Sequence, residues 1–505
     1  MEQEKQKIRI PMMQRSLTTE LSEEFSIPDY QPEIKRILRV EAQAMPADRY
    51  VGSSSAEFSG KMEYTLFYLG EDGELYGSSF EGDYRVLQLL EIPGDFSFDD
   101  GVLCDADIFS ESVSGRLLSP RKFQIKTRLH SEIRLYATKT LEEEMGNCES
   151  ERLDATLVSC EHLAGQGEPF HLFDEVSVPS GDSIRVISCS GKVLASEASS
   201  VDGKLNCRGD VVLKLTTVKE GSGDAPVILL RKLPFTSEIE LDGLEGDCQA
   251  AFDGCVTSCD VTVEEGRILS DAQVLLSARA LQKNRLTYTR DAFALGEESA
   301  VSLESCGAPV AIASGVGNFT LSTSLPLSEA GLSSEQSVVD VTLLPVVREV
   351  STEEGRLTLS GKCRCHAVAN EGDEWTSVEF EIPFRYDGGA CEPLAAKDVL
   401  ATAKALSCNA KKEGDALRID GEIALSYTLS GEESFTHVAS LTTGEPITHP
   451  ASALRVCYPT SSDSLWSLAK RYHQPLASLA SANDLPLPTV ADDPETLAQT
   501  RFIIV

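Results

Sequence analysis

Residues 204–216 read KLNCRGDVVLKLT, and stretches of the same layout occur at 56–68 as AEFSGKMEYTLFY and at 356–368 as RLTLSGKCRCHAV. The central glycines, Gly60, Gly209 and Gly361, are 149 and 152 residues apart. After each glycine, every second residue is apolar or small, which predicts a strand with one buried face. Repetition at this spacing indicates a domain that occurs three times in the chain.

The copies also share an aromatic residue and turn signals. The aromatic side chain follows each glycine by 23 to 26 residues, at Tyr84, Phe235 and Phe384. Asp202-Gly203 and Glu354-Gly355 predict hairpin turns, because glycine adopts positive φ without strain. A second series of turns is expected at Gly115, Gly266 and Gly414. Each copy therefore contains two strand–turn–strand elements, a pattern typical of β-sandwich domains.

These patterns predict a mainly β protein with three tandem β-sandwich-like domains and a small βααβ domain. The β domains are expected at residues 20–140, 165–290 and 310–440, and the C-terminal domain at 454–505. The other stretches are an N-terminal segment at 1–19 and connectors at 141–164, 291–309 and 441–453. We expect the first connector, which is acidic, to be a short helix or a solvated linker, and the others to be irregular, the last being rich in Pro, Thr and Ser.

The chain has 505 residues and a formal net charge of −35. Such an excess of carboxylates repels phosphate groups, which argues against a general binder of nucleic acids or of anionic membranes. The first residues lack the apolar core of a signal peptide, and no uncharged apolar run reaches the ~18 residues that span a bilayer. We therefore expect synthesis in the cytosol, where the 14 cysteines stay reduced.

The sequence predicts neither catalysis nor metal binding. Cys363 and Cys365 fall on the apolar face of the repeated strand, where a free thiol packs as a small apolar side chain. Cys255 and Cys259 lack a second Cys or His pair at the spacing of a zinc site. The seven histidines are scattered, and neither a nucleophile elbow nor a phosphate-binding loop is present. We therefore predict a protein that is not an enzyme and holds no cofactor.

The last fifty residues follow a different pattern. Asp463 or Ser464 can cap a helix whose apolar side includes Leu465 and Leu468. A second short helix is expected to begin at Pro475. The final residues, RFIIV, are expected to form a closing strand.

This region resembles the LysM family. The resemblance lies in the runs DSLWSLAKRY and LASLASANDL and in the terminal FIIV. It implies a shallow groove for N-acetylglucosamine glycans between residues 460–465 and 483–490. The partner- or glycan-binding candidates are Asp463, Ser464, Leu465, Trp466, Asn483 and Leu485. Trp466 has two interpretations: it packs against the closing strand, or it anchors a partner.

The β copies resemble the SPOCS domain family of spore-forming bacteria. LSEEFSIPDYQPEIKRILRVEAQAMPADRYV and FSGKMEYTLFYLGEDGELY in the first copy carry this resemblance. SPOCS domains followed by a LysM domain are found in spore coat morphogenesis proteins. The resemblance implies a scaffold in the mother-cell cytosol at the forespore surface, with the LysM domain docking to the coat ATPase or another coat protein.

Three functional hypotheses follow from these observations. The first is the non-enzymatic scaffold. The second is a protein of the cell wall or cortex that binds peptidoglycan or related glycans through LysM. The third is a hydrolase that LysM targets to its substrate, which would require a convergent pair of acidic residues in one β domain.

Overall fold

The structure is a computed structural model that describes residues 6–52, 54–90, 102–146, 148–178, 184–219, 226–246, 248–264, 266–372, 374–448, 455–486, 492–497 and 500–505. The prediction of a mainly β protein is confirmed, since the helices are few and short. No helix in these ranges is long and apolar enough to cross a membrane.

Strands of similar length recur in each copy. The first copy contains β1 (Lys7–Ser26), β2 (Ile34–Ala44), β3 (Asp48–Val51), β4 (Ser55–Gly70), β5 (Leu75–Leu89), β6 (Val102–Ser119) and β7 (Lys122–Thr140). The second contains β8 (Ser150–Gln166), β9 (Phe170–Ser177), β10 (Ile184–Val201), β11 (Lys204–Lys219), β12 (Val227–Glu240), β13 (Cys248–Glu264) and β14 (Arg267–Ala294). The third contains β15 (Glu297–Pro326), β16 (Ser337–Ser351), the 3-10 turn η2 (Glu353–Gly355), β17 (Arg356–Glu371), β18 (Glu374–Ala390), β19 (Asp398–Glu413) and β20 (Ala416–Pro446).

Each copy pairs its strands in the same way. In one sheet the repeated strand is central: β4 lies between β2/β3 and β5, β11 between β10 and β12, and β17 between β16 and β18. In the other sheet β7, β14 and β20 are central, flanked by β1 and β6, by β8/β9 and β13, and by β15 and β19. In the second copy a bridge between Lys192 and Cys255 joins the two sheets.

The repeated glycine lies directly opposite the repeated aromatic residue. The register pairs Gly60 with Tyr84, Gly209 with Phe235 and Gly361 with Phe384. A Cβ atom at Gly209 would lie 2.2 Å from the Leu194 carbonyl oxygen and 3.0 Å from the Phe235 ring. Only glycine lets the ring and the neighbouring backbone approach so closely, which explains why the two features recur together.

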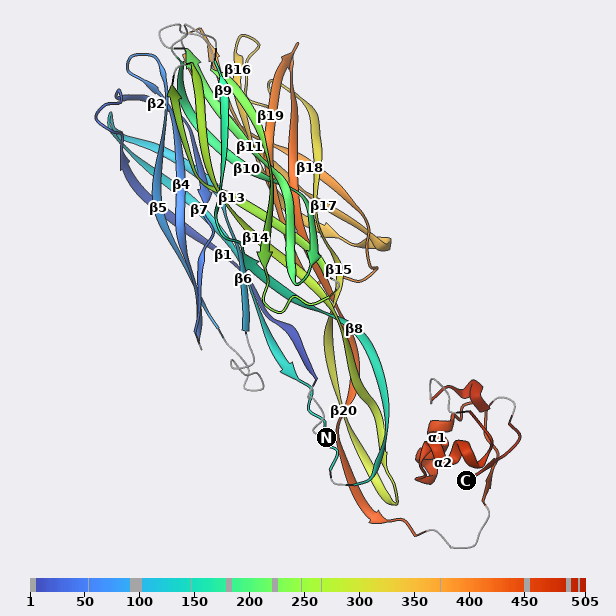
Figure 1. Cartoon of the computed structure of the whole chain (residues 1–505). Helices are drawn as coiled ribbons and strands as arrows, with labels where there is room; N and C mark the ends of the chain where they lie inside the picture. The colour runs from blue at the N-terminus through green and yellow to red at the C-terminus, as the bar shows by residue number, and fades with distance from the viewer. Residues whose placement is uncertain are drawn as a thin grey trace.

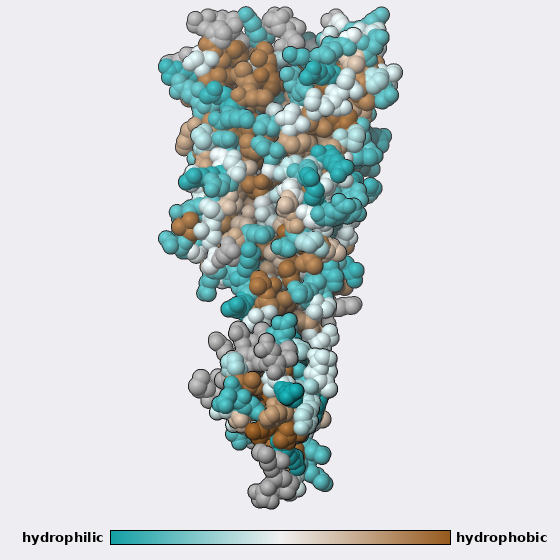
Figure 2. Space-filling model, turned by 90° about the vertical axis from the view of Figure 1, so that its right-hand side faces the viewer, coloured by the Kyte–Doolittle hydropathy of each residue, from teal (hydrophilic) through white to brown (hydrophobic). Residues whose placement is uncertain are grey.

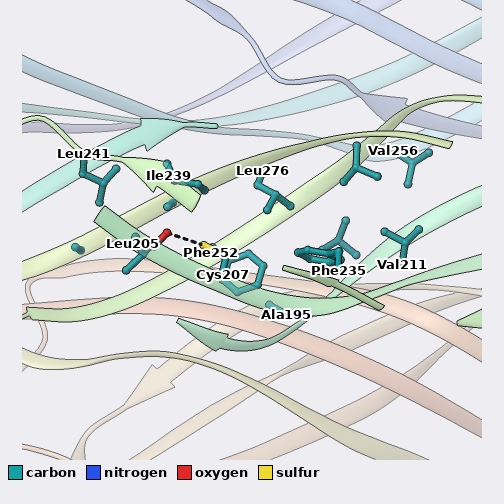
Figure 3. Close-up of a cluster of buried hydrophobic side chains, with 14 of the residues drawn as sticks. Ala195, Leu205, Cys207, Val211, Phe235, Ile239, Leu241, Phe252, Val256 and Leu276 are labelled. Atoms are coloured by element: carbon teal, nitrogen blue, oxygen red, sulfur yellow. Dashed lines mark hydrogen bonds between the residues drawn. The ribbon is translucent and has the colours of Figure 1, made fainter. Parts of the chain in front are cut away.

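The apolar residues after each glycine form the core of their copy. In the second copy, Leu205, Cys207 and Val211 of β11 pack with Phe252 of β13 and Leu276 of β14 (Figure 3). In the third copy, Cys363 and Cys365 stand where the second copy has Val211 and Leu213, and they have no exposed surface. The prediction that these thiols pack in the core is confirmed.

Four of the expected turns are confirmed, and one is wrong. Gly203, Gly355, Gly266 and Gly414 lie at hairpin turns with φ of 77°, 68°, 75° and 63°. Gly115, in contrast, lies inside β6, and the turn of that hairpin is formed by Pro120 and Arg121. The first copy makes this turn without glycine, so the glycine signal at Ser114-Gly115 selected the wrong position.

The expectation that every cysteine is a free thiol is wrong for one pair. Cys189 of β10 and Cys259 of β13 form a disulfide, and their Cα atoms are 6.4 Å apart. The two residues are 70 positions apart in sequence, and no local spacing marks such a pair. Cys255, four positions before Cys259, is buried and free.

The connectors expected at 141–164 and 291–309 are largely strands. β8 runs antiparallel to residues 277–294 of β14, and the first half of β15 runs antiparallel to residues 430–446 of β20. These four segments form a stalk that extends from one end of the body (Figure 1). The prediction of irregular structure was wrong because polar residues alternate there with residues such as Val301 and Leu303, which suits a solvated strand. The last connector begins as strand, since β20 continues to Pro446, and residues 449–454 lie outside the described residues.

Asp340 of the third copy binds cations from both other copies. Its carboxylate accepts hydrogen bonds from Arg39 of β2 at 2.8 Å and from Lys214 of β11 at 2.9 Å. The side chains of Arg39 and Asp340 are only 6% and 7% exposed. Burial alone would raise the pKa of Asp340, but the two cations outweigh it and lower the pKa.

A second buried aspartate of the third copy, Asp398, also joins this copy to the other two, at a different place in the interior. It accepts a hydrogen bond from Arg134 of β7 at 2.9 Å, and it lies 3.5 Å from the His162 ring of β8. Tyr136 also donates to this carboxylate. The three copies are thus joined along their shared interior at two levels, and they form one body.

Candidate functional site

The C-terminal module, residues 455–505, contains all six residues predicted to bind a partner or glycan. Its elements are β21 (Val456–Cys457), α1 (Leu465–Tyr472), α2 (Leu476–Ala482), the 3-10 helix η3 (Pro494–Leu497) and β22 (Ile503–Ile504). Residue 454 and residues 487–490 of the expected second loop lie outside the described residues.

Ser464 fixes the start of α1. Its hydroxyl accepts a hydrogen bond from the Ser467 N–H at 3.1 Å, and the Ser467 hydroxyl accepts one from the Ser464 N–H at 2.9 Å. This reciprocal cap satisfies two backbone donors that the helix cannot. The predicted capping role of Ser464 is confirmed, and the same contacts occupy its side chain.

Asp463 holds the loop before α1. Its carboxylate accepts hydrogen bonds from the Thr460 N–H at 2.8 Å, the Thr460 hydroxyl at 2.9 Å and the Arg471 guanidinium at 2.7 Å. The backbone hydrogen bond from Thr460, aided by Arg471, lowers the pKa of Asp463. With three donors already bound, this carboxylate organises the loop from within.

Asn483 joins the end of α2 to the last strand. Its Nδ2 donates to the carbonyl of Leu479 at 2.9 Å and to that of Ile504 at 2.8 Å, while its Oδ1 accepts from the Ile504 N–H at 2.7 Å. Leu485 is half-buried and packs on the core of the module, and Leu465 is fully buried in that core. These three residues stabilise the module itself.

Trp466 attaches the module to the body. It is 4% exposed and packs edge-on against Phe293 of β14, with ring centroids 5.1 Å apart. Its Nε1–H donates to the Asp291 carboxylate at 2.9 Å. The indole also belongs to the cluster that contains Ile503 of β22. The partner that the structure gives Trp466 is therefore the protein's own stalk.

Three further contacts surround this attachment. Lys470 donates to Asp291 at 2.5 Å, and His473 Nδ1 donates to the Ala294 carbonyl at 3.0 Å. Arg290 pairs with Asp492 near η3. Asp291, Phe293 and Ala294 lie in the stretch that the sequence assigned to a connector. The signal that could have found them is the apolar pattern of AFAL, residues 292–295, beside an acidic residue.

The surface that the module leaves open lies on its sheet. Val456, Tyr458 and Phe502 are 42%, 74% and 49% exposed. Arg455 and Arg501 flank them and are exposed as well. None of these five residues was among the predicted binding residues, because the LysM resemblance directed attention to the two loops.

A cavity of about 230 Å³ lies between the copies and is lined by Lys192 and Lys404. Lys192 donates to the Gln43 side chain at 2.6 Å, and Lys404 donates to Asp253 at 2.7 Å. Burial, and then the proximity of Lys404, lower the pKa of Lys192. Gln43 comes from the first copy, Lys192 and Asp253 from the second and Lys404 from the third, so the polar groups around the cavity hold the copies together.

No three His, Cys, Asp or Glu side chains in the described ranges are grouped so that they could hold a metal ion. No family model matches the sequence, and no curated protein matches it.

Proposed function

We propose that this protein is a non-enzymatic scaffold of the spore coat whose LysM-like module docks to a coat morphogenetic protein such as the coat ATPase. The observation that carries the proposal is the attachment of the module to the stalk through Trp466, Asp291 and Phe293. The helices of the module lie toward the stalk (Figure 1), and Val456, Tyr458 and Phe502 of its sheet region are exposed. A body made of three interlocked copies suits a role in which position matters more than chemistry.

The SPOCS-like assignment of the three copies is part of this proposal. It is supported by the shared strand pairing and by the glycine–aromatic pair that recurs in every copy. The two sheets of each copy enclose its own apolar cluster, as in a β-sandwich.

Glycan binding by the module has weaker support. Asp463, Ser464 and Asn483 already use their polar atoms within the module. A glycan would have to compete with these hydrogen bonds or bind elsewhere. The protein-docking role is therefore the better supported one.

The test is a pull-down of purified coat ATPase by the full-length protein and by a chain that ends before residue 450. We expect recovery of the ATPase by the full-length protein only. Circular dichroism of the shortened chain checks that the β body still folds. Equal recovery by both chains would remove the docking role. Titration calorimetry of the full-length protein with a chito-oligosaccharide covers the alternative, since heat without ATPase recovery would favour glycan binding.

A further inference from the structure

The two edges of the small sheet in the module are not equivalent. In the β21–β22 register Val456 lies opposite Ile504, and the Val505 N–H donates to the Arg455 carbonyl at 3.0 Å. Hydrogen-bonded and non-hydrogen-bonded positions alternate along an antiparallel pair. The backbone groups of Val456 and Ile504 therefore point away from each other, toward the two edges.

One edge is closed, and the other is open. The Asn483 side chain binds both the N–H and the carbonyl of Ile504, so it acts as a substitute for a third strand beside β22. On the β21 side, the N–H and carbonyl groups of Val456 have no partner in the part of the chain that the structure describes. An edge strand with unpaired backbone groups is a template for another extended chain.

The outer face beside this open edge is apolar. Val456 and Tyr458 are two positions apart and share a face, and continuation of the register places Phe502 opposite Tyr458. The opposite face carries Ile503, which has no exposed surface. Figure 2 faces this side of the molecule and shows apolar atoms exposed at its narrow end.

Two arginines alternate along the strands with the residues of the apolar face. Arg455 and Arg501 have no ion pair among the described residues, whereas Arg471 and Arg290 pair with Asp463 and Asp492. The module has a net charge of −1 and the rest of the chain −34. Arg455 thus places an unpaired cation next to the open edge of an otherwise acidic molecule, whereas Arg501 lies on the β22 side of the small sheet.

We propose that the β21 edge binds an extended segment of a partner protein in which apolar and acidic residues alternate. The segment adds a third strand beside Val456, sets its apolar side chains against Val456 and Tyr458, and presents a carboxylate to Arg455. This inference deepens the proposed docking role, because it states how the module recognises its partner and what chemistry the partner carries.

The experiment uses the full-length protein and two synthetic seven-residue peptides, one alternating Glu with Val and one alternating Lys with Val. Hydrogen exchange is followed in fragments that cover residues 455–459. With the Glu–Val peptide at ten times its Kd, exchange of the Val456 and Tyr458 amides slows about tenfold, because only the free fraction exchanges. The Lys–Val peptide gives no protection.

Three variants separate backbone recognition from charge recognition. Val456→Pro removes the outward N–H and abolishes protection at Tyr458, whereas the control Val456→Thr keeps the N–H and retains it. The variant Arg455→Glu reverses the preference, so that the Lys–Val peptide protects and the Glu–Val peptide does not.

The proposal is overturned if neither peptide slows exchange, or if Val456→Pro leaves the protection unchanged. Protection that grows with protein concentration in the absence of peptide would assign the edge to a second copy of this chain and would also overturn it. These outcomes are independent of the ATPase pull-down, so the docking role can stand while this mode of recognition fails.

Discussion

The interior of the body and the joint between body and module are held together in different ways. Asp340 and Asp398 are almost fully buried, and each contacts side chains from both other copies. Asp291 is half-buried, and it holds only Trp466 and Lys470 of one module. The body therefore depends on buried charges for which the loss of a partner is costly. The joint instead combines one half-buried carboxylate with the buried apolar contact between Trp466 and Phe293.

The largest effect on stability is expected from the variant Asp340→Ala, which tests whether buried charges hold the body together. The substitution removes the carboxylate that Lys214 and Arg39 share in the interior and leaves Arg39 with Glu41 alone, and we expect it to lower the free energy of unfolding by about 3–5 kcal/mol. Urea unfolding measures this loss. The matched control is Asp420→Ala, which removes an exposed pair with Arg418 and should cost less than about 1 kcal/mol. Similar losses for the two variants would show that the buried contact does not hold the copies together.

The second test measures how the stability of the body depends on pH through His162, which lies beside Asp398. Burial lowers the pKa of His162 from 6.5 to about 4. The nearby carboxylates of Asp398 and Asp105 raise this pKa, and the cations Arg134 and Arg279 lower it, but burial has the largest effect. The unfolded chain binds a proton below pH 6.5, whereas the folded chain resists it until about pH 4. Stability contributed by neutral His162 is therefore complete above pH 6.5 and is lost as the pH falls.

We expect this group to remove about 2 kcal/mol of unfolding free energy between pH 7 and pH 5. His162→Gln cannot take up the proton, so its stability should fall less over the same interval. The comparison of the two slopes cancels the titration of groups elsewhere in the chain. Parallel slopes would contradict the assignment of a buried neutral imidazole.

The smallest effect is expected at the joint. Asp291→Ala removes the acceptor for Trp466 and Lys470, and it should weaken docking of the module by about 1 kcal/mol. Trp466 is one of two tryptophans, so in a Trp375→Phe background its fluorescence reports docking alone. We expect a red shift of its emission and an unchanged unfolding midpoint of the body. A shift of that midpoint comparable with Asp340→Ala would show that the joint is part of the body.

The sequence predicted local features better than long-range ones. The burial of the residues after Gly209 and of Cys363 and Cys365 was predicted correctly, because every second residue of a strand points to the same face. The cap at Ser464 is likewise local. The Arg39–Asp340 pair, in contrast, joins residues 301 positions apart, and no spacing in the sequence marks it.

The candidate site was predicted only in part for the same reason. The loop residues Asp463 and Asn483 were singled out, and the structure shows that they hold the module together. Asp291 and Phe293 were missed because the pattern around them suits either a connector or a solvated strand. The open edge at Val456 exists because no strand pairs with its outward backbone groups among the described residues, and a sequence alone does not show which strands pair.

The placement of Asp340 and Asp398 in the third copy has a consequence for synthesis on the ribosome. Arg134 precedes Asp398 by 264 residues, so at ~5–20 residues per second it is made on the order of 10–50 s before its acceptor. During that time the first two copies expose cations that later become interior. The nascent chain thus completes its body only after the third copy has been translated, and a message truncated before codon 340 yields a product with neither of these contacts.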